Sequence, residues 1–257
     1  MINSNESFST ILYTQFEHAS NEPNCTFLNF MYGLINDKLV SRGKSDKIIE
    51  IGSGPGVSAK FIKHANILRT DLLAWEDSKI PIQPRVNAHA LPFRDNEFGA
   101  LFAVDTIHHL SDPIFAICEM QRVVKNGGLL IFIEPYISFL SYPIYKLFHH
   151  ESSSWSFSQK SFNSAVSDLA GDGDQGIPKF LFTNNEMVNQ ITNGSRGLDL
   201  DIMLFAPFSF FATGGLSKPL PVPRSLIKFL ISIESKIPQI FMRYVASRML
   251  ISLKITK

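Results

Sequence analysis

The sequence predicts an α/β fold built on an open, doubly wound sheet, and three observations support this. The apolar pair Ile48-Ile49 runs directly into a glycine loop at residues 50–56. Residues 98–110 begin with a continuous apolar run of strand length, as expected for a parallel strand buried on both faces. Helical spacing at residues 112–124, with Lys125-Asn126-Gly127-Gly128 as C-cap and turn, precedes another buried strand at residues 129–133. Strands that alternate with helices favour a mostly parallel sheet with helices on both faces.

The glycine loop reads Glu50-Ile-Gly-Ser-Gly-Pro-Gly56, and residues 57–62 can open a helix after it. Glycine has no Cβ and adopts positive φ without penalty, so the backbone N–H groups of such a loop can surround an anionic or strongly accepting ligand. The dinucleotide fingerprint G-x-G-x-x-G would place its third glycine at Val57, whereas this chain has it one residue earlier. The spacing disfavours a nucleotide-dependent oxidoreductase. A Gly-Pro turn that only joins strand to helix is the alternative.

An acid follows the loop at a distance typical of α/β cofactor domains. Residues 66–71 form a short β-type run that ends in Asp71, about twenty residues after Glu50. A carboxylate at this place has two oxygens that can accept from both hydroxyls of a ribose diol. The loop and Asp71 together therefore predict a cofactor site.

Several segments resemble class I S-adenosylmethionine-dependent methyltransferases. The early third glycine, with an acid two residues before Gly52, resembles the first motif of that family, and Asn87-Ala88 before Leu-Pro-Phe resembles its third-strand segment. Residues 122–131, Arg-Val-Val-Lys-Asn-Gly-Gly-Leu-Leu-Ile, strongly resemble the R-V-L-K-P-G-G segment of the quinone-biosynthesis-like subgroup, methyltransferase type 11. The resemblance covers residues 47–137, under half of the chain.

This resemblance implies a Rossmann-like, doubly wound sheet of seven strands, mostly parallel with an antiparallel last strand. It also implies S-adenosyl-L-methionine as methyl donor and S-adenosyl-L-homocysteine as product. The glycine loop would wrap the amino-acid end of the cofactor, Asp71 would bind the ribose, and the Asn87 pair would meet the adenine. The residues that the resemblance assigns to the cofactor are Glu50, Gly52, Ser53, Gly54, Gly56, Asp71, Leu72, Asn87, Ala88 and Asp105.

Two departures from the family pattern qualify this assignment. Relatives usually have Asp where this chain has Asn87, and an amide oxygen still accepts a hydrogen bond but brings no charge. We therefore expect somewhat lower cofactor affinity. The second departure is Gly99, which replaces a family Asp at the entry to a strand, and its effect should be small.

The chain is predicted to form one domain, because a length of 257 residues with 45% hydrophobic content can bury a large core. Insertions are expected after strand 5 and between strands 6 and 7, the last two strands lying near residues 198–205 and 249–256. The predicted parts are a helical cover (1–46), a cofactor-binding core (47–137), a flap (138–196) and a C-terminal part with a basic amphipathic helical insertion (197–257).

Composition favours a cytoplasmic enzyme. The chain has two cysteines at no paired spacing, and its start lacks the basic and apolar regions of a signal peptide. Charged residues and prolines interrupt the longest apolar region, residues 129–148, so no transmembrane helix is expected. Nucleic acid is an unexpected partner, because the basic stretch is mixed with aliphatic residues and lacks interleaved stacking aromatics.

The net charge of +1 is unevenly distributed. Residues 218–257 contain eight basic residues and one acid, Glu234, which leaves this segment at 8 − 1 = +7. Two interpretations stand. The basic, apolar helices make peripheral contact with an anionic membrane at its inner face, or they pack on the sheet with Lys and Arg stems at the edge.

Methyl transfer from a sulfonium donor mainly requires alignment of the reacting atoms and exclusion of water. A base is needed only when the accepting atom carries a proton. His108, His109 and Glu134 are the catalytic candidates, because they follow strands at the carboxyl edge where open α/β sheets bind ligands. Purely structural roles remain open for all three. No metal site is predicted, since the His149-His150-Glu151 cluster lacks a third ligand at a familiar spacing.

The predicted function is methylation of an oxygen in a small molecule or a lipid-linked glycan. The glycan preference rests on a loose resemblance of the Glu134-Pro-Tyr and His149-His-Glu segments to methyltransferases found among surface-polysaccharide enzymes, and on the basic apolar segment. Carbon or oxygen methylation of a quinone-type precursor is the close alternative. A cofactor-binding assembly or regulatory protein without catalysis is the alternative from another class.

Overall fold

The computed structural model describes residues 22–43, 45–76, 78–149, 151–158, 161–163, 173–193, 198–215 and 220–256. Its strands are β1 (Ile48–Ile51), β2 (Ile67–Thr70), β3 (Phe98–Val104), β4 (Val124–Pro135), β5 (Leu198–Phe205) and β6 (Arg248–Ile255). Its helices are α2 (Glu22–Leu39), α3 (Pro113–Val123), α4 (Ser141–Phe148), α6 (Ile177–Thr183), α7 (Asn185–Asn193), α8 (Ser209–Ala212), α9 (Arg224–Glu234) and α10 (Gln239–Val245). Parts of the predicted helical cover and flap, with His150, Lys218 and Lys257, lie outside these residues.

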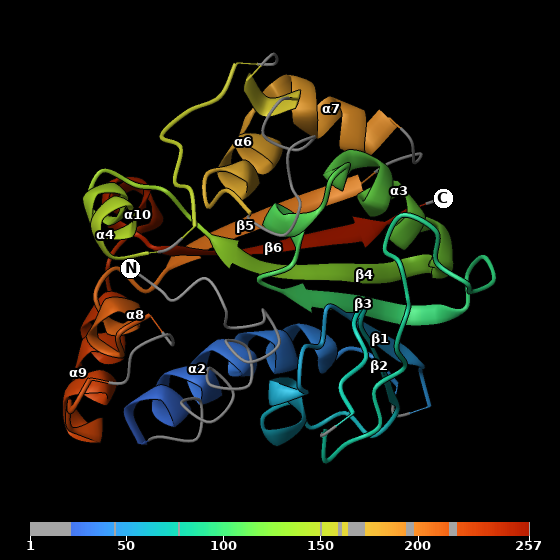
Figure 1. Ribbon diagram of the computed structural model, residues 1–257, viewed down its shortest axis with the longest axis horizontal. Coiled ribbons are helices and arrows are strands. Elements are labelled where there is room, and N and C mark those ends of the chain that lie inside the picture. Colours follow the sequence, from blue (N-terminus) through green and yellow to red (C-terminus); the bar gives the residue numbers. More distant parts are fainter. Residues whose placement is uncertain are drawn as a thin grey trace.

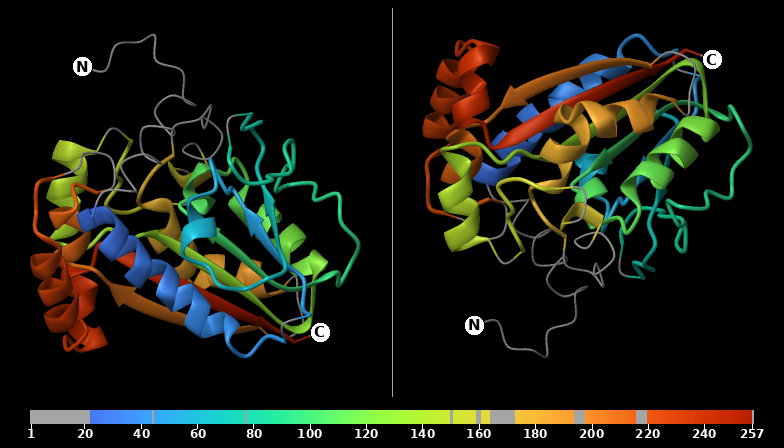
Figure 2. Two further views of the ribbon diagram at one scale, coloured as in Figure 1. Left: turned by 90° about the horizontal axis from the view of Figure 1, so that it is seen from below. Right: turned by 90° about the horizontal axis from the view of Figure 1, so that it is seen from above.

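The strands form one mixed sheet in the order β2-β1-β3-β4-β6-β5. β6 is antiparallel to both of its neighbours, and the pairs among β1 to β4 are parallel. The predicted α/β class and the antiparallel last strand are thus confirmed. Figure 1 shows α3, α6 and α7 on one face of the sheet and α2 on the other, while α4, α8, α9 and α10 gather at one end. The two views of Figure 2 show the same layers.

Burial on both faces explains why the central strands read as continuous apolar runs. In β3, Leu101 and Ala103 enter the core beneath α3 and α6, and Ala100 and Phe102 enter the core beneath α2. The residues of β4 alternate in the same way. The sheet is therefore the wall between two apolar layers, and its carboxyl edge is where polar side chains can gather.

The expected third strand is reduced to a single bridge. Among the described residues the sheet has six strands, and the segment from Val86 onward, expected to be the third, is not one of them. Gln83 alone pairs with Thr70 of β2, in parallel. Pro81 and Pro84 flank that bridge, and a proline lacks the N–H that a longer ladder needs.

Two local expectations at glycines were also wrong. Residues 57–62 form a 3₁₀ turn, Val57–Lys60, and not the start of an α-helix. Gly127 and Gly128, predicted to cap α3, instead lie inside β4, where the pairing with β3 shifts register. Gly127 has φ of +73°, and a Cβ on Gly128 would lie 2.4 Å from Val124 Cγ1. At the bulge, Gly127 therefore supplies a backbone conformation that other residues rarely adopt, and Gly128 supplies the space for the Val124 side chain.

Replacing Phe132 of β4 should be costly, because its ring is buried and packs against Phe182 of α6 at a centroid distance of 6.0 Å. We expect Phe132→Ala to lower the free energy of unfolding by about 3–5 kcal/mol in a denaturant titration. The exposed Phe229→Ala is the matched control and should cost less than about 0.5 kcal/mol. Equal losses in the two variants would contradict the assigned core.

Candidate functional site

The glycine loop at the end of β1 forms a backbone cradle. Gly52, Gly54 and Gly56 have φ of +69°, +51° and +90°, values that other residues rarely adopt. A Cβ on Gly52 would lie 2.4 Å from the Thr106 hydroxyl, so this glycine allows the loop to touch the segment after β3. Nothing lies within 4 Å of the equivalent point on Gly54, which leaves its backbone open to a ligand.

Glu50 and Ser53 hold the loop from within the fold. The Glu50 carboxylate is buried, accepts a 2.5 Å hydrogen bond from Ser58 Oγ and lies 3.4 Å from Arg69 Nε. Burial raises the pKa of Glu50 to about 7, although Ser58 and Arg69 favour its charged form. Ser53 Oγ accepts from the N–H of Thr70 at 3.2 Å. These contacts tie the loop to β2.

Asp71 lies at the loop, as its spacing predicted. Its two carboxylate oxygens accept from the N–H groups of Gly54 and Leu73, each at 2.8 Å. A carboxylate oxygen has a second lone pair, so both oxygens can still accept from a diol. The neighbouring Leu72 side chain is exposed and offers an apolar surface beside it.

Asn87 and Ala88, the residues predicted to contact the adenine, lie next to Asp71. The N–H of Val86, directly before them, donates to the Asp71 carbonyl at 3.0 Å. Asn87 Oδ1 accepts from the N–H of His89 at 2.9 Å, and Ala88 is buried. The Asn87 side chain thus shapes its own turn. Its contact with a cofactor stays a prediction.

A second group of polar side chains lies across Thr106 from the glycine loop. Glu134, near the end of β4, is fully buried and accepts from the N–H groups of Thr106 and Ile107 at 2.9 and 2.8 Å. Its other oxygen lies 2.6 Å from His108 Nδ1. One carboxylate therefore fixes both the turn after β3 and the orientation of the His108 ring.

His108 lies between two acids. Its Nε2 atom is 3.5 Å from Glu151 Oε2, and His109 Nε2 is 3.7 Å from Glu151 Oε1. Burial by itself would lower the pKa of His108, but the carboxylates of Glu134 and Glu151 outweigh it and raise the pKa to about 10. The imidazolium in turn helps to hold the pKa of Glu134 below its ordinary value. At neutral pH this is a charged pair, with His108 protonated.

Asp105, the predicted strand-end acid, lies near His108 and Glu134. It has a positive φ of 50° and accepts from Arg248 Nη2 at 2.6 Å. Arg248, the first residue of β6, is buried, and its guanidinium carbon lies 5.1 Å from the Phe210 ring centroid. Arg248 is one of the eight basic residues of segment 218–257, but because it is buried it is not part of a basic surface.

Three residues of this group were not assigned roles from the sequence: Glu151, Gln175 and Arg248. Glu151 was noticed only as part of a histidine cluster, and Gln175 contacts both His108 and Glu151. Gly173 permits this packing, since a Cβ there would lie 2.8 Å from both His108 Cδ2 and His109 Nδ1. In the sequence, the one feature that could have indicated a buried role for Arg248 is its position immediately before the apolar run of β6.

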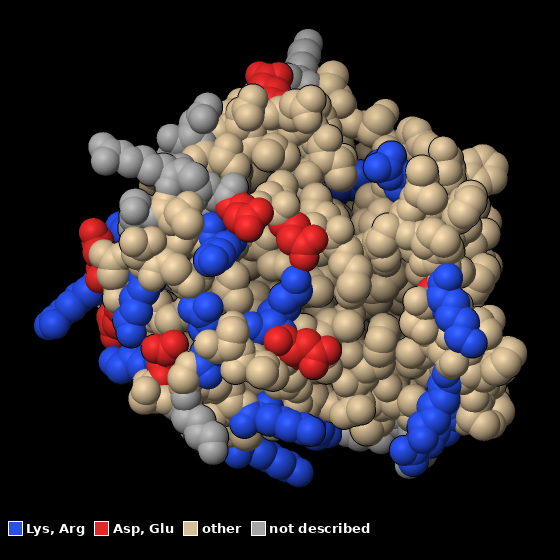
Figure 3. Space-filling model, turned by 180° about the vertical axis from the view of Figure 1, so that it is seen from behind, with Lys and Arg blue, Asp and Glu red and all other residues tan. Residues whose placement is uncertain are grey.

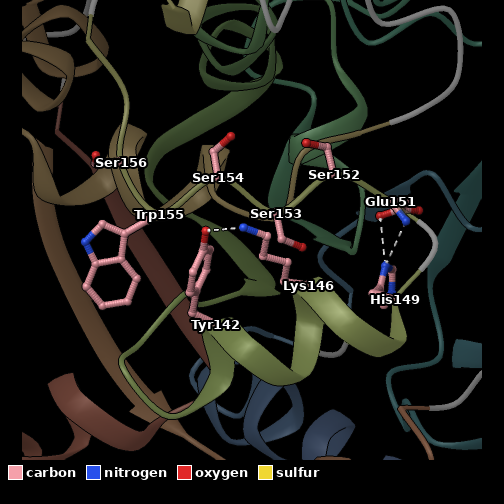
Figure 4. A pocket seen from close by; sticks show the side chains of 9 residues that line it. All are labelled: Tyr142, Lys146, His149, Glu151, Ser152, Ser153, Ser154, Trp155 and Ser156. Carbon is pink, nitrogen blue, oxygen red and sulfur yellow. Dashed lines mark hydrogen bonds and ion pairs between the residues drawn. The ribbon is translucent and has the colours of Figure 1, made fainter.

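An open cleft of about 570 Å³ leads away from Glu151 (Figure 4). The side chains that line it come from α4 and the segment after it: Tyr142, Lys146, His149, Glu151, Ser152, Ser153, Ser154, Trp155 and Ser156. Asp174 holds the serine segment by accepting from the hydroxyls of Ser152 and Ser154 at 2.8 and 2.7 Å. Hydroxyls, a cationic amine and an indole ring thus lie beside the acid and histidine group.

The expectation of no metal site stays a prediction. His108, His109 and Glu151 each offer a ligand atom, and these atoms lie within 4.8 Å of one another. Asp105, His108 and Glu134 do the same. The ion pairs described above account for the approach of these groups without invoking a further ligand.

Comparison with known proteins identifies the glycine-loop region. The family described as "Methyltransferase domain" matches residues 49–132, which include the loop, Asp71, Asn87-Ala88 and Asp105. Residues 49–132 form a class I S-adenosylmethionine-dependent methyltransferase domain. The match ends within β4, before Glu134 and the segments that carry Glu151 and Arg248.

Individual relatives of the methyltransferase domain resemble only part of this chain. An uncharacterized methyltransferase of Schizosaccharomyces pombe is 27% identical over 106 residues, which are 33% of this chain and 38% of that protein. A ubiquinone/menaquinone biosynthesis C-methyltransferase of Hahella chejuensis is 40% identical over 50 residues, 20% of each chain. The chain therefore aligns with well under half the length of these relatives.

The fold of one solved structure matches a longer part of this chain. Geranyl diphosphate C-methyltransferase from Streptomyces coelicolor, in complex with Mg²⁺, geranyl diphosphate and S-adenosyl-L-homocysteine, has a TM-score of 0.51 and 16% identity. The comparison covers 87% of this chain and 77% of that one. At this identity the agreement concerns the fold.

The loop fits S-adenosylmethionine, the cofactor of this domain. Three positive-φ glycines and the open approach to Gly54 suit the amino-acid end of the cofactor, and the Asp71 oxygens border the same space. Among the described residues no helix is long and apolar enough to cross a bilayer.

Removing the Asp71 carboxylate should weaken the binding of S-adenosylmethionine. We expect Asp71→Ala to raise the dissociation constant about 10- to 100-fold in calorimetry, because hydrogen bonds to a charged group contribute about 1.5–3 kcal/mol. Asp71→Asn retains one acceptor and should lose less. The exposed Glu76→Ala is the control and should bind like the wild type. Equal affinity in Asp71→Ala and the control would refute the ribose assignment.

Glu50 should make stability depend on pH. Its pKa is raised to about 7 in the folded state, so the folded protein holds this proton more tightly than the unfolded chain and loses stability as pH rises from about 4.5 to about 7. We expect Glu50→Gln to remove that loss, with the variant gaining about 3 kcal/mol on the wild type across this interval, at about 1.4 kcal/mol per pKa unit. Denaturant titrations at several pH values, with Glu76→Gln as control, would measure it.

Proposed function

We propose that the chain transfers the methyl group of S-adenosylmethionine to an oxygen of a small molecule or a lipid-linked glycan. One observation carries this proposal: the Glu151 carboxylate lies 3.5 Å from His108 Nε2 and 3.7 Å from His109 Nε2, and these histidines follow Thr106, which lies against Gly52 of the cofactor loop. An oxygen acceptor that carries a proton must lose it during transfer, and a group that can receive a proton at the carboxyl edge of β3 and β4 suits that need.

Bound S-adenosylmethionine supplies a methyl group that its sulfonium already activates. The residues of this chain then hold the acceptor hydroxyl in line with the methyl carbon and the sulfur. The acceptor oxygen forms its bond to carbon as the carbon–sulfur bond breaks, and the electron pair of that bond stays on the sulfur of S-adenosyl-L-homocysteine. The hydroxyl proton passes to Glu151.

Glu151 suits the role of proton acceptor better than His108 does. His108 is protonated at neutral pH, because Glu134 and Glu151 raise its pKa to about 10. It can therefore orient Glu151 and stabilise its negative charge, but it has no free lone pair for a proton. We accordingly assign proton acceptance to Glu151, and positioning of Glu151 to His108 and Glu134.

The composition of the cleft favours a hydroxylated acceptor. Ser152, Ser153, Ser154 and Ser156 line it together with Lys146 and Trp155, the side chains seen in Figure 4. The Ser152 and Ser154 hydroxyls donate to Asp174, and their oxygens can still accept from sugar hydroxyls. The Trp155 ring, packed at 73° to Tyr142, offers an apolar surface for the C–H groups of a sugar.

A second candidate is methylation of a quinone-type precursor at carbon or oxygen. The segment that is 40% identical to a ubiquinone/menaquinone C-methyltransferase favours it. That segment covers 20% of the chain. The acceptor must therefore be decided by experiment.

Comparative mass spectrometry of lipid-linked glycans, quinones and small metabolites, with and without the gene, would identify the acceptor. We expect one species to lose one oxygen-bound methyl group in the absence of the gene. The purified protein should restore that methyl group from labelled S-adenosylmethionine. Label on a ring carbon of a quinone would overturn the proposal in favour of the second candidate.

Replacing Glu151 should slow methyl transfer to this acceptor without affecting the donor. We expect Glu151→Gln to lower kcat about 100- to 10,000-fold, the usual contribution of a positioned proton acceptor. The dissociation constant of S-adenosylmethionine should stay unchanged. The exposed Glu186→Gln on α7 is the matched control. A kcat for Glu151→Gln equal to that of the control would refute the role of Glu151.

A further inference from the structure

Large apolar side chains are exposed together at one end of the molecule. They lie on α9, on α10, and at both ends of the α4 segment, and six of them define what we call the apolar face: Phe139, Phe148, Phe229, Ile240, Phe241 and Tyr244. Each has between 59% and 77% of its surface exposed. Figure 1 shows α4, α9 and α10 at the same end, and the N–H of Leu140 donates to the Tyr244 carbonyl at 3.0 Å.

These side chains are not exposed because their helices fail to pack on the core. The other sides of the same helices are buried: α9 packs inward through Ile227 and α10 through Met242. Tyr145 of α4 is buried and donates to the Ser247 carbonyl at 2.9 Å. Each helix therefore has one face in the core and a second apolar face turned to solvent, unlike an ordinary surface helix.

The charge around the apolar face has one sign. Residues 136–149 and 208–247 contain a single acid, Glu234, and it is buried, where it accepts from the N–H groups of Phe208 and Ser209 and from the Ser209 hydroxyl. The exposed charges at this end are the cations Lys146, Arg224, Lys228, Lys236 and Arg243. Figure 3 shows this end at the right, with separate blue side chains on a tan surface and most red side chains toward the other end.

We propose that the apolar face binds the surface of an anionic lipid bilayer. Aromatic and aliphatic side chains among cations are the composition of helices that lie in a membrane interface, where apolar groups enter the acyl boundary and Lys and Arg meet anionic headgroups. The apolar side chains stand on three separate helices with cations between them. A broad, adaptable surface such as a bilayer can contact all of them at once.

The position of the apolar face links it to the acceptor. The carboxyl ends of β3 and β4 point toward the end that carries α4 and α10. The cleft beside Glu151 is lined by Tyr142 and Lys146, from the same α4 that contributes Phe148. A bilayer on the apolar face would thus lie next to the cleft, where a lipid-linked acceptor can enter. This last step rests on the proposed function, whereas bilayer binding itself does not.

Vesicle flotation of the full chain tests the proposal. We expect binding to vesicles of phosphatidylcholine mixed with phosphatidylglycerol, weaker binding to phosphatidylcholine alone, and a decrease as salt is added. The double variant Phe229→Ser/Phe241→Ser should bind at least about tenfold more weakly, since it removes two apolar anchors. Phe115→Ser is the matched control, because Phe115 is exposed on α3, away from the apolar face.

Charge is tested separately. Lys228→Glu should weaken binding to the anionic vesicles about fivefold or more, and Lys63→Glu, an exposed lysine on another part of the surface, should not. Titration with S-adenosylmethionine shows whether each variant is folded, because none of the replaced residues is assigned to the cofactor site.

Three outcomes would overturn the proposal: no binding to anionic vesicles at low salt, equal binding by the double variant and Phe115→Ser, or a dimer in solution that the double variant dissociates. The last result would assign the apolar face to a second copy of the chain. Loss of vesicle binding with full activity on a water-soluble acceptor would leave the proposed methyl transfer intact, so the two proposals fail separately.

Discussion

The functional region depends on one buried carboxylate, that of Glu134. It lies at the end of β4, and its two oxygens accept from the backbone of Thr106 and Ile107 and from the ring of His108. A buried carboxylate without such partners would be strongly destabilising, so the chain after β3 must turn where it does to supply the donors. That turn brings Thr106 against Gly52 of the cofactor loop and points His108 toward Glu151. One electrostatic requirement thus sets the relative position of the cofactor loop and the acid and histidine group.

The parts of the fold that could be predicted are those governed by local pattern. Apolar runs of strand length at β3 and β4 and helical spacing at α3 depend on burial periodicity, which a sequence displays directly. The glycine loop and Asp71 could be placed because strand, turn and return segment use up a nearly fixed length of chain. Even here local chemistry changed the details: Pro81 and Pro84 removed the donors of the third strand, and Gly127 and Gly128 became a bulge in place of a helix cap.

The acid and histidine group was predictable only in part, since its members come from segments far apart in sequence. His108, His109 and Glu134 follow strands and were visible as candidates at the carboxyl edge. Glu151 and Gln175 come from the long segment between β4 and β5, where no repeating pattern fixes the path of the chain. Net charge was also misleading. Arg248 and Glu234 count toward the charge of the C-terminal segment, yet both are buried and neither contributes to its surface.

The topology explains why the apolar face and the acid and histidine group lie at the same end. In an all-parallel sheet, the last strand would start at the edge opposite to the ligand site, and the helices before it would stand far from the cofactor. Here β6 runs antiparallel, so Arg248, its first residue, pairs with Phe205 and Pro135 at the carboxyl ends of β5 and β4. The chain from Phe205 to Arg248, which contains α8, α9 and α10, must therefore leave and re-enter the sheet at the edge where Glu134 lies. A surface built on those helices adjoins the acid and histidine group because of the direction of one strand, and the ion pair of Arg248 with Asp105 ties that strand to the end of β3.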